Sequence, residues 1–177
     1  MAKDLFITYA KYNQWMNRSI YTTCKALGQD AIEKDQGAFF GSILRTLNHL
    51  LIADIFWLTR CSGDASLAAV YDAEGNAIRI RALDQLVYAD IEELGAARAA
   101  LDDKIIGFVE SLPEDALKTD IQYRTSQGQT LANPLDVIML HWFNHQTHHR
   151  GQITTLLTQQ GAEVGLTDLI YIKDLVN

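Results

Sequence analysis

The stretch "PLDVIMLHWFNHQTHHRGQITTLLTQQG", from Pro134 to Gly161, has the pattern of one long helix. Many of its apolar residues recur three and four positions apart, which is the spacing of one helical face. Asn133 can cap the start of this helix, and Pro134 suits its first position. Gly161 is suited to ending it after about Gln160.

Three earlier segments also have helical periodicity. The first runs from about Lys3 to Leu27, and the second from about Phe40 to Arg60. The second is apolar almost all round, which is typical of a helix enclosed by several neighbours. The third runs from about Leu83 to Ser111 and carries an apolar stripe of Leu83, Leu86, Val87, Ile91, Leu94, Leu101, Ile105 and Phe108. The predicted fold class is all-α.

Two connections between these helices are long, residues 61–82 and 112–132. A link of ~20 residues can extend over ~60 Å, whereas a helix of ~24 residues is only ~36 Å long. Either link can therefore join parallel helices across the length of a bundle. The Gln-Gly step in "DIQYRTSQGQTL" predicts a small hairpin before the last long helix. The order of the helices in the bundle is not readable from this pattern.

Composition limits the class of protein. A chain of 177 residues fits one domain, residues 1–177. A net charge of −7 with scattered basic residues argues against binding nucleic acid. No segment has the uninterrupted apolar length of a signal core or a membrane span, so we expect a cytoplasmic protein. Cys24 and Cys61 are expected to be buried free thiols.

Four of the five histidines lie within the nine residues His141–His149. At about 100° per residue, His145 and His149 fall inside or at the edge of the apolar stripe of the last helix. His141 and His148 fall on its flank. Two imidazoles four residues apart on one face can share a metal ion. They can equally be core histidines satisfied by hydrogen bonds, and periodicity does not place His49, on the second helix, toward either.

Other residues near the histidines have two possible roles each. Gln152 can support a metal ligand by a hydrogen bond, or can simply border a cavity. Trp142 is a candidate pocket wall. Asp54 is a weak candidate for a general base and a better one for a buried hydrogen-bonding partner. Arg150 falls away from the apolar stripe, which predicts a salt bridge or a dimer contact.

Several motifs resemble the DinB-like family of small bacterial helical proteins. They are "GAFFGSILRTLNHLLIADIFWL" at 37–58, the stretch at 134–161, "YNQWMN" at 12–17 and "YRTSQGQTLANP" at 123–134. The pattern H…HxxxHHRGQ is the most specific of them. This resemblance implies a four-helix bundle of up-down-down-up order, frequently a homodimer. It also implies three metal ligands, which on this chain are His49, His145 and His149.

The resemblance implies less about activity. Some relatives transfer a low-molecular-weight thiol to an electrophile, some are isomerases that use such a thiol, and others were described as metal-dependent hydrolases. Three imidazoles suit a divalent transition metal, and we expect zinc or nickel. The leading hypothesis is a metal-dependent thiol transferase acting on a small-molecule substrate. The alternatives are a metal-dependent hydrolase, a protein in which the metal only joins two helices, and a metal-free interaction module.

Overall fold

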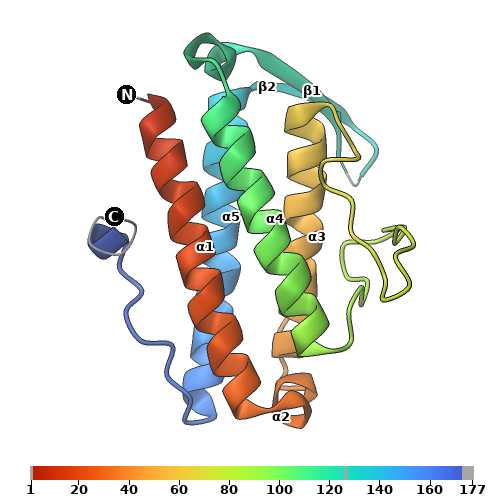
Figure 1. Ribbon diagram of the computed structural model, residues 1–177, viewed down its shortest axis with the longest axis vertical. Coiled ribbons are helices and arrows are strands. Elements are labelled where there is room, and N and C mark those ends of the chain that lie inside the picture. The colour runs from red at the N-terminus through yellow and green to blue at the C-terminus, as the bar shows by residue number, and fades with distance from the viewer. Residues whose placement is uncertain (1, 126, 173–177) are drawn as a thin grey trace.

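Four long helices lie side by side in the computed structural model, which describes residues 2–125 and 127–172 (Figure 1). They are α1 (Ala2–Leu27), α3 (Ile43–Ser62), α4 (Ile91–Ser111) and α5 (Leu135–Gln159). In Figure 1, α1 and α5 run downward, and α3 and α4 run upward. Both α1 and α3 pack against α4 and α5. The prediction of a helical protein is therefore confirmed.

The remaining elements are short. Helix α2 (Gln29–Glu33) follows α1, and single 3₁₀ turns occupy Glu114–Lys118 and Leu169–Tyr171. Strands β1 (Asp120–Arg124) and β2 (Thr130–Pro134) pair antiparallel, which confirms the predicted hairpin. Its turn contains Gly128 at a φ of +82°, a conformation that residues with a β-carbon rarely adopt. The hairpin caps the end of the molecule where α5 begins (Figure 1).

Helix α4 begins eight residues later than the apolar stripe predicts. The side chain of Asp90 accepts hydrogen bonds from the backbone of Glu92 and Glu93, which fixes the start of the helix at Ile91. The preceding segment is held in place by Asn48, whose side chain bonds the backbone of Val87 and Tyr88. Residues 83–90 are therefore a connecting segment, and their helical spacing of apolar residues was misleading.

Two other helix starts also differ from the prediction. Helix α3 begins at Ile43, not Phe40, because the Ser42 hydroxyl accepts a hydrogen bond from the backbone of Arg45. Helix α5 begins at Leu135 with Pro134 as the residue before it. Asn133 does not cap this helix, since its side chain donates to the Tyr123 hydroxyl across the hairpin.

A network of buried polar side chains joins all four long helices. Asp54 on α3 accepts hydrogen bonds from Trp142 and Gln146 on α5, and pairs with Arg98 on α4 at 2.8 Å. Arg98 also pairs with Asp102, which accepts from Asn17 on α1. Burial by itself would lower the pKa of Arg98, but the two carboxylates raise it above its ordinary value. The role of Asp54 is thus that of a buried hydrogen-bonding partner, as favoured over a general base.

Arg150 is buried and forms no ion pair within residues 2–125 and 127–172, which corrects the prediction of a salt bridge or a dimer contact. Only 3% of it is exposed, and its guanidinium lies over the Tyr12 ring at 5.3 Å. It also donates to the side chains of Gln146 and Thr147. Burial lowers the pKa of Arg150 to about 10. The helical wheel failed because α1 covers a second face of α5, so the buried surface is wider than the apolar stripe.

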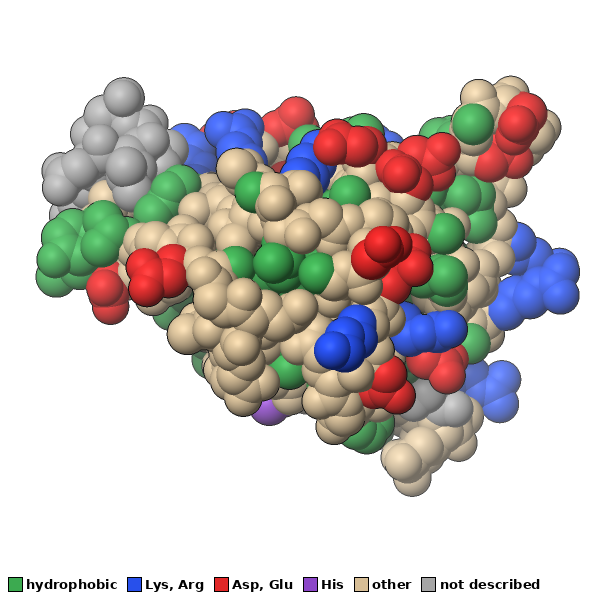
Figure 2. Space-filling view, turned by 90° about the horizontal axis from the view of Figure 1, so that it is seen from below, with side chains coloured by type: hydrophobic (Ala, Val, Ile, Leu, Met, Phe, Trp, Pro, Cys, Tyr) green, Lys and Arg blue, Asp and Glu red, His purple; other side chains and the backbone are tan. Residues whose placement is uncertain are grey.

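The buried cysteines and the charged surface are those of an ordinary globular protein. Cys24 and Cys61 are buried and free, as predicted. Charged side chains of both signs alternate on the end of the molecule seen in Figure 2. Among residues 2–125 and 127–172, no helix combines the length and apolar character needed to cross a membrane.

The Asp54 network predicts a large stability effect for a small change. Asp54→Asn removes a buried negative charge and leaves Arg98 with Asp102 as its remaining charged partner. We expect a loss of about 3–5 kcal/mol in the free energy of unfolding, measured by urea denaturation, because an amide cannot accept from Arg98, Trp142 and Gln146 together and leaves buried donors unsatisfied. Asp103→Asn, at an exposed position on α4, is the control and should change stability by about 0.5 kcal/mol or less. Equal effects of the two changes would contradict the assigned role.

Candidate metal centre

Helices α3 and α5 bring together three histidines that are far apart in the sequence. His49 lies on α3, and His145 and His149 lie one turn apart on α5. The Nε2 atom of His145 is 3.3 Å from Nε2 of His49 and 3.1 Å from Nε2 of His149. One possible ligand atom of each residue lies within 4.8 Å of the others. The three rings therefore point one nitrogen each toward a common position.

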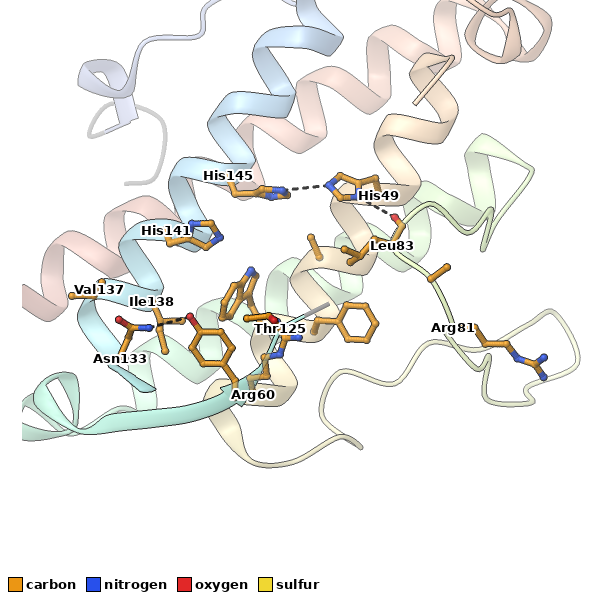
Figure 3. Close-up of a pocket in the computed structure, with 15 residues that line it drawn as sticks. His49, Arg60, Arg81, Leu83, Thr125, Asn133, Val137, Ile138, His141 and His145 are labelled. Atoms are coloured by element: carbon orange, nitrogen blue, oxygen red, sulfur yellow. Dashed lines mark hydrogen bonds between the residues drawn. The ribbon is translucent and has the colours of Figure 1, made fainter. Parts of the chain in front are cut away.

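The outer nitrogens of two rings have fixed partners. Nδ1 of His49 lies 2.9 Å from the backbone carbonyl oxygen of Leu83, which can only accept (Figure 3). Nδ1 of His149 lies 2.8 Å from Oε1 of Gln152. Both Nδ1 atoms are therefore the protonated ones in the neutral rings, and both Nε2 atoms carry bare lone pairs. This is the arrangement by which neighbouring groups orient metal-binding histidines.

His145 lies between these two lone pairs. Its Nδ1 is buried and has no hydrogen-bond partner among the described residues. A single proton on Nε2 of His145 can serve only one of the facing nitrogens of His49 and His149 at a time. The Nε2 lone pair of either His49 or His149 would then have no donor from these rings. Leaving a partly buried acceptor unsatisfied is unfavourable. A cation between the three rings would satisfy all three lone pairs at once.

The donor set and the distances fit a transition metal. Zinc bonded tetrahedrally to nitrogen at about 2.0–2.1 Å places its ligand nitrogens roughly 3.3 Å apart. The two closest nitrogen pairs here are 3.3 and 3.1 Å apart. Three imidazoles suit zinc, nickel, copper, cobalt or iron, whereas magnesium and calcium require oxygen ligands. The three-histidine cluster is thus able to hold a divalent transition metal ion.

Burial keeps these histidines in the form that binds metals. Burial, together with the neighbouring imidazoles of His149 and His49, lowers the pKa of His145 to about 3. Burial also lowers the pKa of His49 and of His149, although their Nδ1 hydrogen bonds oppose the change. Neutral imidazole is the form that coordinates a metal. The site is therefore ready to bind at neutral pH.

The two flanking histidines have other surroundings. His148 is exposed, and its Nε2 accepts a hydrogen bond from the Gln152 amide at 3.2 Å. His141 is exposed and packs edge-on against Trp57 with 5.2 Å between ring centroids. The predicted division of this histidine run into an inward pair and two flank residues is confirmed. His141 nevertheless lines the same cavity as the cluster, which the wheel did not indicate.

The structure places the supporting residues in part as expected. Gln152 bonds a histidine of the cluster, His149, through its Oε1 atom. Trp142 is fully buried and donates to Asp54, so it is no wall of the described cavity. Trp57 takes that place.

Two groups of the site were missed by sequence reasoning. The carbonyl oxygen of Leu83 acts through the backbone, so no side-chain pattern reveals it. Phe40 stacks on His49 with ring centroids 4.1 Å apart and also contacts His149. The only sequence feature that could have indicated this contact is the position of Phe40 two residues before Ser42, the residue that caps α3. Phe40 therefore lies in the chain that enters this helix.

An open cavity of about 690 Å³ adjoins the cluster (Figure 3). His49 and His145 form part of its wall, and helix α3, helix α5, the hairpin and the segment before α4 form the rest. The described lining contains two arginines and no Asp or Glu. Its residues are His49, Ala53, Phe56, Trp57, Arg60, Arg81, Ala82, Leu83, Tyr123, Thr125, Asn133, Val137, Ile138, His141 and His145.

Comparisons with known proteins agree with this architecture. Protein DinB of Bacillus subtilis (strain 168) is 27% identical over 165 residues, which cover 93% of this chain and 91% of that protein. The crystal structure of a DinB-like protein from Bacillus cereus ATCC 10987 superposes with a TM-score of 0.57 at 17% identity. That match covers 86% of this chain and 90% of the other, and shows a shared fold. The sequence model of the DinB family matches residues 1–175, and the chain therefore belongs to the DinB family.

Proposed function

We propose that this protein is a metal-dependent transferase that activates a low-molecular-weight thiol, with His49, His145 and His149 as ligands of zinc or nickel. The observation that carries the proposal is the convergence of three imidazole Nε2 atoms at the wall of an open cavity. A buried ion that only joins α3 to α5 would need no such cavity. A divalent metal held there supplies a Lewis acid, which lowers the pKa of a coordinated thiol or water.

The protein's own groups then have defined tasks. The Leu83 carbonyl oxygen and Gln152 hold the His49 and His149 rings in orientation. Phe40 covers His49 and limits access of water from that side. The cavity holds the thiol and an electrophile together. The sulfur forms a bond to the electrophilic atom, the thiol proton passes to solvent water, and the leaving group departs with the electrons of the bond that breaks.

The lining of the cavity favours thiol transfer over hydrolysis. A hydrolase that activates water commonly uses a nearby carboxylate as general base. None of the described lining residues is Asp or Glu, and Asp54 is committed to the buried network. A thiol activated by the metal needs no such base. A hydrolase and a non-catalytic metal protein are the alternatives that an activity screen of metal-loaded protein, with thiols and electrophiles in combination, would separate.

We further infer that residues 1–177 form one domain, an up-down-down-up four-helix bundle that works in the cytoplasm as a homodimer. The family match over residues 1–175 supports one domain, and the helix directions in Figure 1 support the order.

Buried free Cys24 and Cys61 suit a reducing compartment. Exposed Leu5 and Leu140 offer apolar surface to a second copy. The acidic net charge supports a small-molecule substrate over nucleic acid, and no membrane attachment is proposed.

Alanine variants of all five histidines test the ligand set. His49→Ala, His145→Ala and His149→Ala should lose tight metal binding, because three imidazoles are the whole proposed donor set. His141→Ala and His148→Ala should keep nearly full occupancy, since neither ring belongs to the cluster. Metal per chain, measured by mass spectrometry on protein purified without a polyhistidine tag, decides this. Loss of the ion from His148→Ala with retention in His149→Ala would refute the assignment.

Gln152 tests the orientation of His149. Gln152→Leu removes the acceptor of the Nδ1 proton, and we expect metal affinity to fall about 10–100-fold. Gln159→Leu, the same change at an exposed position of α5, is the matched control and should leave affinity unchanged. Competition with a chromogenic chelator gives both affinities. A weaker metal site in the control variant would show that the effect is not specific to Gln152.

The lowered pKa values of the cluster predict acid sensitivity. Below the ordinary value near ~6.5, the unfolded chain binds protons on these histidines before the folded protein does. Stability should therefore be full above ~6.5 and fall as pH decreases, and the metal-loaded form should approach the metal-free form between about pH 6 and 4.5. Thermal melting with and without chelator across this range measures both effects. Identical curves for the two forms at neutral pH would mean that the metal does not join the helices.

A further inference from the structure

The cavity beside the histidines has a second chemically distinct end. Its lining follows α3 from His49 through Ala53, Phe56 and Trp57 to Arg60. Arg60 follows His49 by eleven residues, which corresponds to a rise of roughly 16 Å along the helix. At the far end, Thr125 and Asn133 of the hairpin segment complete the wall (Figure 3). Tyr123 lies there too, with its ring centroid 5.6 Å from the Arg60 guanidinium carbon. The cavity is therefore elongated, with the histidine cluster at one end and Arg60 at the other.

Arg60 is held in place by aromatic rings. Its guanidinium carbon lies 4.9 Å from the Trp57 ring centroid and 5.6 Å from the centroids of Phe56 and Tyr123. One Nη2 hydrogen bond goes to the backbone oxygen of Arg124 at 3.0 Å. Stacking on rings orders an arginine without consuming its hydrogen-bond donors. Arg60 thus presents its other donors in a fixed orientation.

No acidic side chain neutralises Arg60 in the described structure. Within residues 2–125 and 127–172, it forms no ion pair with Asp or Glu, and the described cavity lining has no carboxylate. A partly desolvated guanidinium with unused donors favours an anion, best a carboxylate or a phosphate. Because the chain has a net charge of −7, an unpaired positive charge in this cavity distinguishes it as a place for an anion.

Tyr123 adds a second donor at the same end. Its hydroxyl oxygen accepts from the Asn133 amide at 3.0 Å, and its own hydrogen has no acceptor among the described residues. The ring also packs edge-on against Trp57 at 5.3 Å. Tyr123 lines the cavity together with Arg60, so its hydroxyl is the second donor that we assign to the anion.

We propose that the cavity selects an elongated small molecule whose anionic group binds Arg60 and Tyr123 while its reactive sulfur lies at the histidine cluster. The apolar middle of the molecule packs on Phe56, Trp57 and Val137. The position of the sulfur rests on the proposed function, whereas the anion site rests only on the cavity and Arg60. Arg81 is not assigned this role, since its exposed side chain points away from the other labelled side chains in Figure 3.

Binding of matched probes by calorimetry tests this proposal. The probes are mercaptoalkanoic acids, mercaptoalkyl phosphates and uncharged mercaptoalkanols of equal chain length, added to metal-loaded protein. We expect the anionic probes to bind about tenfold or more tightly than the alcohols, which is the usual strength of charge-assisted hydrogen bonds. The better of the two anions identifies carboxylate or phosphate. Equal affinity of all three probes would overturn the proposal.

Variants assign the preference to Arg60. Arg60→Gln should abolish it, and Arg60→Lys should retain part of it, because lysine keeps the charge without the planar donor pair. Arg45→Gln makes the same charge change at an exposed position of α3 outside the cavity and should have no effect. Metal content measured in parallel should equal wild type in all three. An intact preference in Arg60→Gln, or its loss in Arg81→Gln alone, would refute the site.

A metal-free arm separates this site from the proposed function. Alkanoic acids and alkanols without sulfur are titrated into metal-depleted protein and into its Arg60→Lys and Arg60→Gln variants. An anion preference that depends on Arg60 should persist there. If it persists while thiol probes bind the metal-loaded protein no better than their sulfur-free analogues, the thiol function fails and the anion site stands. If it is absent from metal-depleted and metal-loaded protein alike, the anion site fails by itself.

Discussion

The buried carboxylate of Asp54 is the point at which the long helices of this protein are joined. It accepts from Trp142 and Gln146 on α5 and pairs with Arg98 on α4, which in turn reaches Asp102 and, through it, α1. A buried charge is costly unless every partner is in place, so helices that slide by one turn would lose several of these bonds together. The network therefore specifies one relative position of the helices more strictly than apolar packing does.

That position is also what assembles the histidine cluster. Asp54 follows His49 by five residues on α3, and Gln146 is the neighbour of His145 on α5. Fixing the bond between Asp54 and Gln146 thus fixes the heights of His49 and His145 along their helices, and the two Nε2 atoms meet at 3.3 Å. Polar groups that stabilise the core and groups that form the site are interleaved on the same turns. The geometry of the site is a consequence of the helix register.

The surroundings of the cluster differ on its two sides. Phe40, Leu83 and Gln152 enclose it and orient the rings, while the other side opens into a cavity with aromatic walls and an arginine at its far end. A site that only linked α3 to α5 would have no use for this opening. The combination of three oriented histidines and an open cavity with distinct ends is the feature on which the proposal of chemistry on a small molecule rests for this DinB family member.

The sequence alone determined the helices, the hairpin and the inward direction of His145 and His149, because these depend on local periodicity and turn chemistry. It misplaced the start of α4, since the Asp90 cap and the hold of Asn48 on residues 87–88 outweigh the helical spacing of Leu83 and Leu86. It also put Arg150 on the surface, because a helical wheel does not show that α1 covers a second face of α5. Periodicity did not place His49 beside the pair, although the family resemblance implied it, and the tertiary structure brings the three together. Only the tertiary structure brought the Leu83 carbonyl to His49 and Arg60 to the far end of the cavity. These are contacts between distant segments, and they are decided by how the helices pack rather than by any pattern within one of them.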